Sequence, residues 1–103
     1  MGKKVAVVLS GCGVYDGAEI HESVLTMLAL DRGGAEMIVC APDRQQLHVV
    51  NHHTGEVAED ETRNVRTEAA RIARGPVADV TEIDAAELDA LMDAEAYRAL
   101  TEG

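Results

Sequence analysis

The run Lys4–Ser10, KVAVVLS, followed at once by the loop GCGVYDG of residues 11–17, decides the fold of this 103-residue chain. A short β-branched apolar run that a glycine ends is typical of a strand buried on both faces of a sheet. Apolar residues then recur at helical spacing from Ile20 to Leu28, Gly33 ends the helix, and Met37–Ala41 is a second buried-type strand. Strand, helix and strand in this order predict a right-handed βαβ unit with a parallel pair.

The rest of the chain is less regular. Residues 47–58 contain two short apolar runs around a polar, glycine-containing turn, which predicts a small hairpin. Glu61–Arg74 has the pattern of an amphipathic helix, and Val77–Ile83 that of a weak strand. From Asp84 onward the pattern is helical again, with Leu88 opening a Leu/Met stripe on an otherwise acidic, solvated face. We therefore expect one α/β domain over residues 1–103, with a short, mostly parallel sheet.

Composition limits the partners and the compartment. The formal net charge of −10 repels nucleic acid and anionic lipid, so we expect neither as a partner. No apolar run approaches the roughly 20 residues that span a bilayer, and no signal-type cleavage site follows the first apolar run. Two cysteines, Cys12 and Cys40, are too few for a disulfide framework. The sequence predicts a cytoplasmic protein.

Cys12 lies where the first strand ends, which is the edge at which open α/β sheets bind ligands. Helix amides near this position favour a thiolate, whereas the carboxylates of the next ten residues oppose it. A reactive thiol and an incidental, packed thiol both remain open, and the packed thiol is the favoured interpretation. Cys40 lies in the middle of a strand and is expected in the core.

Two further patterns suggest ligands only weakly. The glycines of residues 11–17 follow a strand and precede a helix, but their spacing is one residue too long for a dinucleotide fingerprint, and acidic residues surround them. Nucleotide binding is therefore the weakest alternative. His48, His52 and His53 lie close in sequence, but at a predicted turn they would point in different directions. We expect neither a cofactor nor a metal ion.

Three longer motifs carry a family resemblance: SGCGVYDGAEIHE at 10–22, CAPDRQQLHVVNHHTGE at 40–56 and TRNVRTEAARIARG at 62–75. Together they resemble the ElbB family, glyoxalase-like proteins that are linked with isoprenoid biosynthesis and belong to the ThiJ/PfpI, class I glutamine amidotransferase-like superfamily. The resemblance runs from about Lys3 to Leu91. It implies a three-layer, flavodoxin-like or Rossmann-like domain, of which this chain would be the N-terminal half.

The resemblance also implies a site. Glu22 matches the family's early helix glutamate, which would hydrogen-bond a cysteine thiolate and shuttle protons while a small 2-oxoaldehyde such as methylglyoxal becomes a hydroxy acid. From the pattern alone, Glu22 is instead a solvated glutamate one turn into the helix. Glu19, expected to complete a capping box with Asp16 as the N-cap, is the second choice for the acid. The loop would form one wall of the pocket, through Gly11, Cys12, Gly13 and Asp16.

The chain departs from the family after Leu91. Residues 92–103 do not continue into the glycine-rich loop and the elbow cysteine that the resemblance leads us to expect, and neither Cys12 nor Cys40 matches that cysteine. We therefore expect a truncated protein with negligible activity alone. If a helix replaces the family's next strand, the edge of Lys4–Ser10 is unpaired and invites a homodimer or a complementary chain. The alternative function is accordingly a non-enzymatic association module or one half of a split protein.

Overall fold

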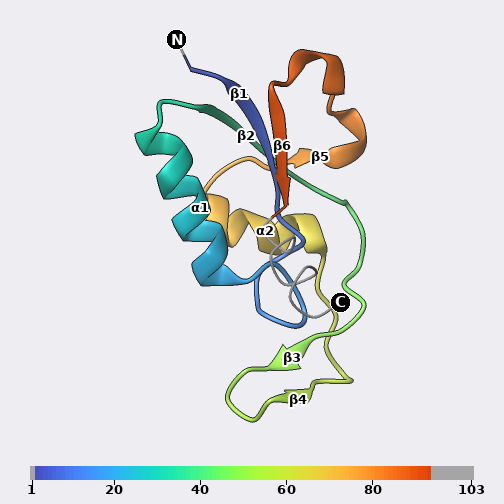
Figure 1. Ribbon diagram of the computed structural model, residues 1–103. Coiled ribbons are helices and arrows are strands. Elements are labelled where there is room, and N and C mark those ends of the chain that lie inside the picture. The colour runs from blue at the N-terminus through green and yellow to red at the C-terminus, as the bar shows by residue number, and fades with distance from the viewer. Residues whose placement is uncertain (1, 94–103) are drawn as a thin grey trace, which may run out of the picture.

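A four-stranded sheet in the order β5-β2-β1-β6 forms the centre of the computed structural model, which describes residues 2–93 (Figure 1). The strand β1, Lys4–Val8, pairs in parallel with β2, Glu36–Ala41, on one side and with β6, Ala90–Asp93, on the other. The short strand β5, Ala78–Asp79, pairs in parallel with β2. The predicted α/β class and the parallel βαβ unit are confirmed.

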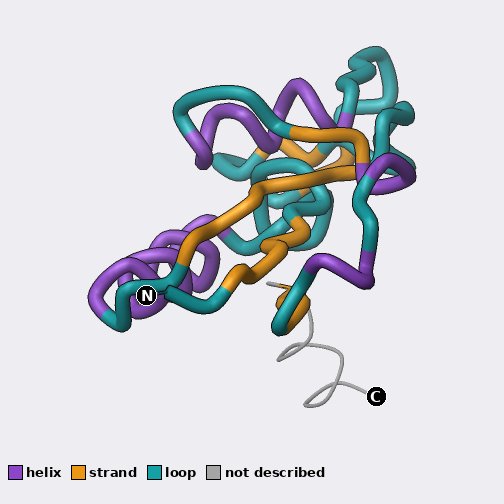
Figure 2. Tube along the Cα trace, turned by 90° about the horizontal axis from the view of Figure 1, so that it is seen from above, coloured by secondary structure: helices purple, strands orange, loops and turns teal. Residues whose placement is uncertain are grey.

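Two helices cover one face of this sheet. Helix α1, Ile20–Arg32, connects β1 to β2, and helix α2, Val65–Ala73, lies between β2 and β5. The connections from β1 to β2 and from β2 to β5 each step in the same direction across the sheet. Because such connections are right-handed, both helices lie on the same face of the sheet (Figure 2). The core lies between that face and the helices, and its buried side chains are Val5, Val7, Leu9, Ala18, Ala41, Val65, Ala69 and Val77.

The predicted hairpin is confirmed as the antiparallel strands β3, Val50–Asn51, and β4, Glu56–Val57. The helix predicted from Glu61 begins four residues later because Asn64 caps it. The Asn64 side-chain oxygen accepts a hydrogen bond from the Thr67 backbone N–H at 2.8 Å. An N-cap of this kind satisfies a backbone donor that has no partner within the helix.

The helix predicted from Asp84 onward is wrong for the part of the chain that the structure describes. Val80–Glu82 and Ala85–Glu87 are single 3₁₀ turns, and the chain then enters β6 beside β1. Long-range hydrogen bonds explain the difference, since Asp89 N–H donates to Lys4 O at 2.8 Å and Lys4 N–H donates to Asp89 Oδ2 at 2.8 Å. The rest of the predicted helix, beyond residue 93, lies outside the described residues.

The pairing of β6 also removes the sequence-based reason for association through β1. Both edges of β1 are occupied, by β2 and by β6, so its apolar backbone is not available to another strand. The chain leaves β1 toward β2 and returns to the other side of β1 at β6, so the strand order reverses between these two strands. In open α/β sheets such a reversal creates a crevice at the carboxyl ends of the strands, where ligands bind.

Candidate functional site

The loop between β1 and α1 is folded tightly at this carboxyl edge. Gly13 N–H donates to Ala18 O at 2.9 Å, which closes the loop upon itself. Gly11 has a φ of +102°, a conformation that side chains disfavour. A Cβ at Gly17 would lie 2.7 Å from the backbone nitrogen of Cys12. The turn therefore requires these glycines, which supports a structural role for them over nucleotide binding.

Helix α1 is capped by Glu19, whereas the sequence pattern predicts Asp16 as the N-cap and Glu19 at the third helical position. The Glu19 Oε1 accepts hydrogen bonds from the backbone N–H groups of His21, at 2.6 Å, and Glu22, at 3.3 Å. These amides are the donors that a phosphate at the helix N-terminus would need. Because a carboxylate already occupies them, the loop is a poor candidate for nucleotide binding.

Asp16 joins the loop to the hairpin. Its Oδ2 accepts a hydrogen bond from Val50 N–H at 2.9 Å, and its Oδ1 accepts one from Val14 N–H at 3.3 Å and lies 3.0 Å from His52 Nε2. Only 5% of the Asp16 side chain is exposed. Burial raises the pKa of Asp16, but the hydrogen bonds from Val50, His52 and Val14 outweigh it and hold the pKa below its usual value. Asp16 is thus an ionised structural link.

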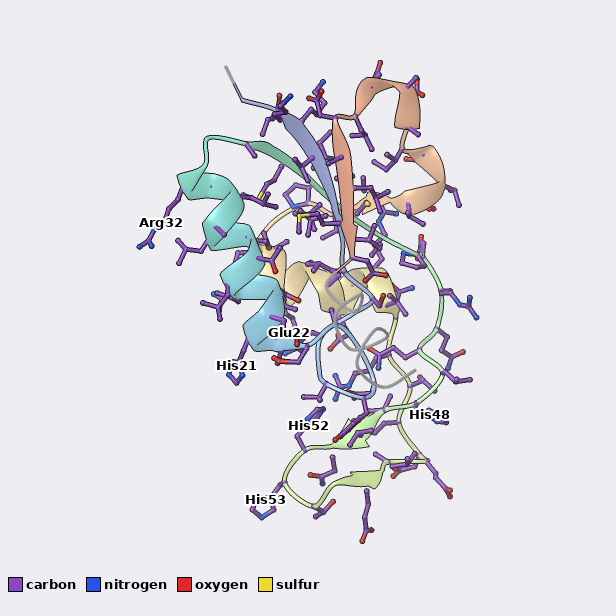
Figure 3. All side chains as sticks on the ribbon, in the orientation of Figure 1. His21, Glu22, Arg32, His48, His52 and His53 are labelled. Atoms are coloured by element: carbon purple, nitrogen blue, oxygen red, sulfur yellow. The ribbon has the colours of Figure 1, made fainter. Side chains whose placement is uncertain are left out.

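Glu22 lies in the first turn of α1, on the side toward the middle of the molecule, whereas the neighbouring His21 points away from it (Figure 3). The Glu22 Oε2 is buried and has no hydrogen-bond partner among the described residues. A buried carboxylate oxygen without a partner is costly, so its presence in a folded protein calls for an explanation, and a catalytic role is one such explanation. Glu22 is therefore not the solvated helix glutamate that its pattern alone suggests.

Cys12 lines a cavity of about 370 Å³ between the loop, the hairpin and α2, and Glu22 does not belong to the residues around this cavity. Burial raises the pKa of the Cys12 thiol; nearby Glu68 and Asp16 raise it further, and Arg71 acts in the opposite direction. The thiol is therefore protonated at neutral pH. The cavity is lined by Cys12, Asp16, Val49, Val50, Asn51, His52, Glu61, Arg63, Glu68 and Arg71.

Ion pairs that the sequence pattern did not predict lie on the α2 side of this cavity. Glu68, whose side chain is 12% exposed, lies with its Oε1 3.1 Å from Arg71 Nε and 3.6 Å from Arg63 NH1. The i,i+3 spacing of Glu68 and Arg71 in the predicted helix could have indicated their pairing, but not that they border Cys12.

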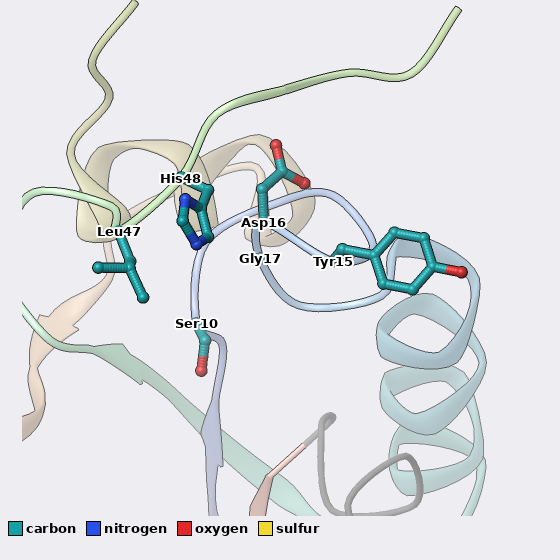
Figure 4. A pocket seen from close by; sticks show the side chains of 6 residues that line it. All are labelled: Ser10, Tyr15, Asp16, Gly17, Leu47 and His48. Carbon is teal, nitrogen blue, oxygen red and sulfur yellow. The ribbon is translucent and has the colours of Figure 1, made fainter. Parts of the chain in front are cut away.

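A second cavity, of about 260 Å³, opens where β1 ends (Figure 4). The loop and the segment before the hairpin enclose it, through Ser10, Tyr15, Asp16, Gly17, Leu47 and His48. Asp16 thus borders both cavities, whereas Gly11 and Gly13 are among the lining residues of neither. Of the predicted pocket wall, the structure brings Cys12 and Asp16 together at the cavity on the α2 side, and Asp16 alone also borders the second cavity.

The clustered histidines have separate environments. His48 lines the second cavity, His52 bonds to Asp16, and His53 is exposed at the hairpin turn (Figure 3). Within residues 2–93, no group of three or more histidine, cysteine, aspartate or glutamate side chains is placed to hold a metal ion. Cys40, expected in the core, is fully buried in β2. No helix of residues 2–93 combines the length and the apolar character needed to cross a membrane.

Comparisons with known proteins find clear relatives. No family model matches the sequence. The human glutamine amidotransferase-like class 1 domain-containing protein 3, mitochondrial, is 55% identical over 87 residues, which are 84% of this chain and 32% of that protein. The zebrafish ES1 protein, mitochondrial, is 39% identical over 92 residues, covering 85% of this chain and 34% of that protein. This chain thus spans about a third of the curated relatives that it matches.

A solved structure has the same fold. The isoprenoid biosynthesis protein with amidotransferase-like domain from Ehrlichia chaffeensis superposes with a TM-score of 0.86 and 44% identity. The match covers 89% of this chain and 43% of that protein's chain. The described fold therefore corresponds to part of an amidotransferase-like domain. Because the human and zebrafish relatives carry "mitochondrial" in their names, a cytoplasmic location stays a prediction.

Proposed function

We propose that this chain, which belongs to the ES1 family of class I amidotransferase-like proteins, provides the acid–base group of a glyoxalase-type active site. The chain spans about a third of the length of its curated relatives. The observation that supports this proposal is the Glu22 Oε2, which is buried and without a hydrogen-bond partner among residues 2–93. It lies at the start of α1, at the edge of the sheet where the strand order reverses. The carboxylate oxygen is thus available to a hydrogen-bond partner that the described residues do not supply.

The proposed reaction converts methylglyoxal and water into lactate. A cysteine thiolate adds to the aldehyde carbon, so that a C–S bond forms and the aldehyde oxygen takes a proton. The Glu22 carboxylate then removes the proton from that carbon and returns it to the neighbouring carbon through an enediol, which gives a lactate thioester. Water cleaves the thioester, and lactate and the thiol are released. No oxidant is needed, because one carbon is oxidised while its neighbour is reduced.

We place the thiolate in the part of the family's domain that this chain does not span. Cys12 is the alternative, but its raised pKa keeps the thiol protonated, and it lines a cavity on the α2 side to which Glu22 does not contribute. On this proposal the chain alone has negligible glyoxalase activity. Glu19 remains the second choice for the acid, although its carboxylate already caps α1.

Lactate formation from methylglyoxal by the purified chain tests this proposal. We expect no turnover above a protein-free control. Robust turnover that Cys12→Ser abolishes would overturn the assignment and make Cys12 the nucleophile. Turnover that survives both Cys12→Ser and Glu22→Gln would place the chemistry elsewhere. Glu82→Gln, at an exposed glutamate of a 3₁₀ turn, is the matched control.

The second candidate function is a non-enzymatic association module. It is favoured by the exposed apolar residues of β6, among them Leu91 and Met92. Nucleotide binding at the glycine loop is the weakest candidate, since Glu19 occupies the helix amides, and an equilibrium titration with ADP or NAD would test it.

A further inference from the structure

The cavity of about 370 Å³ beside Cys12 is separate from the Glu22 carboxylate. It is lined by the loop before α1, by β3 with its flanking residues, by the segment before α2 and by α2 itself, and no residue of α1 or β6 contributes. Small-molecule pockets usually enclose about 300–1,000 Å³, so this volume suits a small ligand. The chemistry of that ligand follows from the hydrogen-bonding groups of the lining that have no partner yet.

The carboxylates that line the cavity already have partners. The hairpin donates to the Asp16 carboxylate. The Glu61 Oε1 accepts a hydrogen bond from Arg63 Nη2 at 2.9 Å. The Glu68 Oε1 lies between two guanidinium groups, 3.1 Å from Arg71 Nε and 3.6 Å from Arg63 Nη1. The two arginines thus balance the charges of the two glutamates.

Donor groups of the same lining have no such partner among residues 2–93. Glu68 engages Arg71 at Nε, so the two terminal nitrogens at the other edge of the planar guanidinium have no ion pair. The Arg71 side chain is 64% exposed and can be reached from solvent. The Asn51 Oδ1 accepts from two backbone N–H groups of the hairpin turn, which leaves the NH₂ of its amide as a donor. The Cys12 thiol is a third and weaker donor.

We propose that this cavity binds a small monocarboxylic acid, whose carboxylate takes the terminal edge of the Arg71 guanidinium. That edge presents two parallel N–H groups, which match the two oxygens of a carboxylate. The NH₂ group of Asn51 is a further donor to the same carboxylate. The short apolar body of the acid lies against Val49 and Val50, which line the cavity as well. A ligand held in this way covers the Cys12 thiol.

Other small ligands fit the cavity less well. A cation needs an acceptor, and the three carboxylates of the lining are engaged by arginines or by the hairpin. Inorganic phosphate brings about two negative charges at neutral pH, and it would lie among three carboxylates and only two arginines. A monocarboxylate brings one charge and an apolar body. The proposed site does not depend on the glyoxalase chemistry, because Glu22 takes no part in it.

Protection of Cys12 from alkylation tests the proposal. The purified chain is treated with iodoacetamide at neutral pH and constant ionic strength, in rising concentrations of sodium butyrate, and mass spectrometry follows the peptide that contains Cys12. We expect saturable protection with a midpoint in the millimolar range, as for other ligands of few atoms. At saturation the alkylation rate should fall by about fivefold or more, because the ligand covers the thiol and adds a negative charge beside it. Butyramide, which has a similar shape without the charge, and inorganic phosphate should not protect.

A pair of arginine variants locates the site. Arg71→Gln should raise the midpoint by about tenfold or more, because it removes the charge and the parallel N–H groups that bind the carboxylate. Arg44→Gln is the matched control, since Arg44 is exposed and outside the lining of the cavity. The midpoint is compared rather than the rate, because Arg71 also lowers the pKa of Cys12 and its removal changes the rate without ligand.

Nuclear magnetic resonance of the unaltered chain gives a second readout that needs no variant. Butyrate should shift the backbone amide signals of Asn51 and Arg71 and leave those of β6 unchanged. The proposal is overturned if butyrate gives no saturable protection, or if butyramide or phosphate protects as well as butyrate does. It is equally overturned if Arg71→Gln and Arg44→Gln have the same midpoint, or if the butyrate-induced shifts lie outside the cavity.

Discussion

Replacement of Asp16 should destabilise the fold more than replacement of any exposed carboxylate. The Asp16 side chain is 5% exposed and links the loop after β1 to the hairpin, by accepting from Val50 N–H at 2.9 Å and by contacting His52 Nε2 at 3.0 Å. Asp16→Ala removes both contacts and leaves the Val50 N–H without this acceptor.

The magnitude follows from these contacts. A hydrogen bond to a charged group contributes about 1.5–3 kcal/mol, and a donor left without its partner adds a penalty of about 1–3 kcal/mol. His52 is 46% exposed, so its contact with Asp16 is weakened by solvent and counts for little. We therefore expect Asp16→Ala to lower the free energy of unfolding by about 3 kcal/mol, a large part of the roughly 5–15 kcal/mol that stabilises a typical domain.

Urea unfolding measures this loss. With a slope of about 2 kcal/mol per molar urea, the midpoint should fall by roughly 1.5 M. Asp60→Ala is the control, because Asp60 is exposed in a turn. Asp16→Asn, which keeps one acceptor oxygen, should fall between the two. If Asp16→Ala shifts the midpoint no more than Asp60→Ala, the link between loop and hairpin does not stabilise the protein.

Three other predictions concern the same loop. The pKa of Asp16 is lower in the folded protein than in the unfolded chain, so ionised Asp16 stabilises the fold fully above the unfolded pKa of about 3.9. This stabilisation is lost as the pH falls through the folded pKa. Asp16→Asn should remove this part of the acid dependence, as measured by unfolding at a series of pH values. Together with burial, Glu68 raises the pKa of Cys12, so Glu68→Gln should speed the alkylation of Cys12 by iodoacetamide at neutral pH. Mass spectrometry measures the rate of alkylation, and an unchanged rate would argue against this electrostatic effect. Gly17→Ala should lower the free energy of unfolding by about 1–3 kcal/mol, because the added Cβ would be overpacked against the Cys12 backbone. Gly75→Ala is the control and should be neutral in the same unfolding assay, since no atom lies within 4 Å of the added Cβ. Equal effects would contradict the close approach of Gly17 to Cys12.

Local sequence patterns were sufficient to predict the first half of the fold. The β-branched run of β1, the apolar spacing of α1 and the second run of β2 each carry their own signal, so the parallel βαβ unit followed from the sequence. At the other end of the chain the pattern misled. Leu88, Leu91 and Met92 have helical spacing, but Leu91 and Met92 lie in β6, where the neighbouring β1 determines the conformation.

Asp16 shows why the details of the site were less predictable. An aspartate three residues before Glu19 has the pattern of a capping box, yet Glu19 is itself the cap of α1. The Asp16 carboxylate is engaged by Val50 and His52, which lie 34 and 36 residues further along the chain. The sequence pattern contained no information on that distant pairing. The burial of the Glu22 Oε2 likewise depends on packing that helical spacing does not report.

The turnover of methylglyoxal by a hybrid protein, in which this chain replaces the matched region of the Ehrlichia chaffeensis protein, tests the central proposal most directly. If Glu22 moves the proton, Glu22→Gln should lower kcat for lactate formation by about a hundredfold or more, while Glu82→Gln leaves kcat unchanged and both variants stay folded. A hybrid whose kcat is the same with Glu22→Gln as with Glu82→Gln would contradict the assignment of Glu22 as the acid–base group.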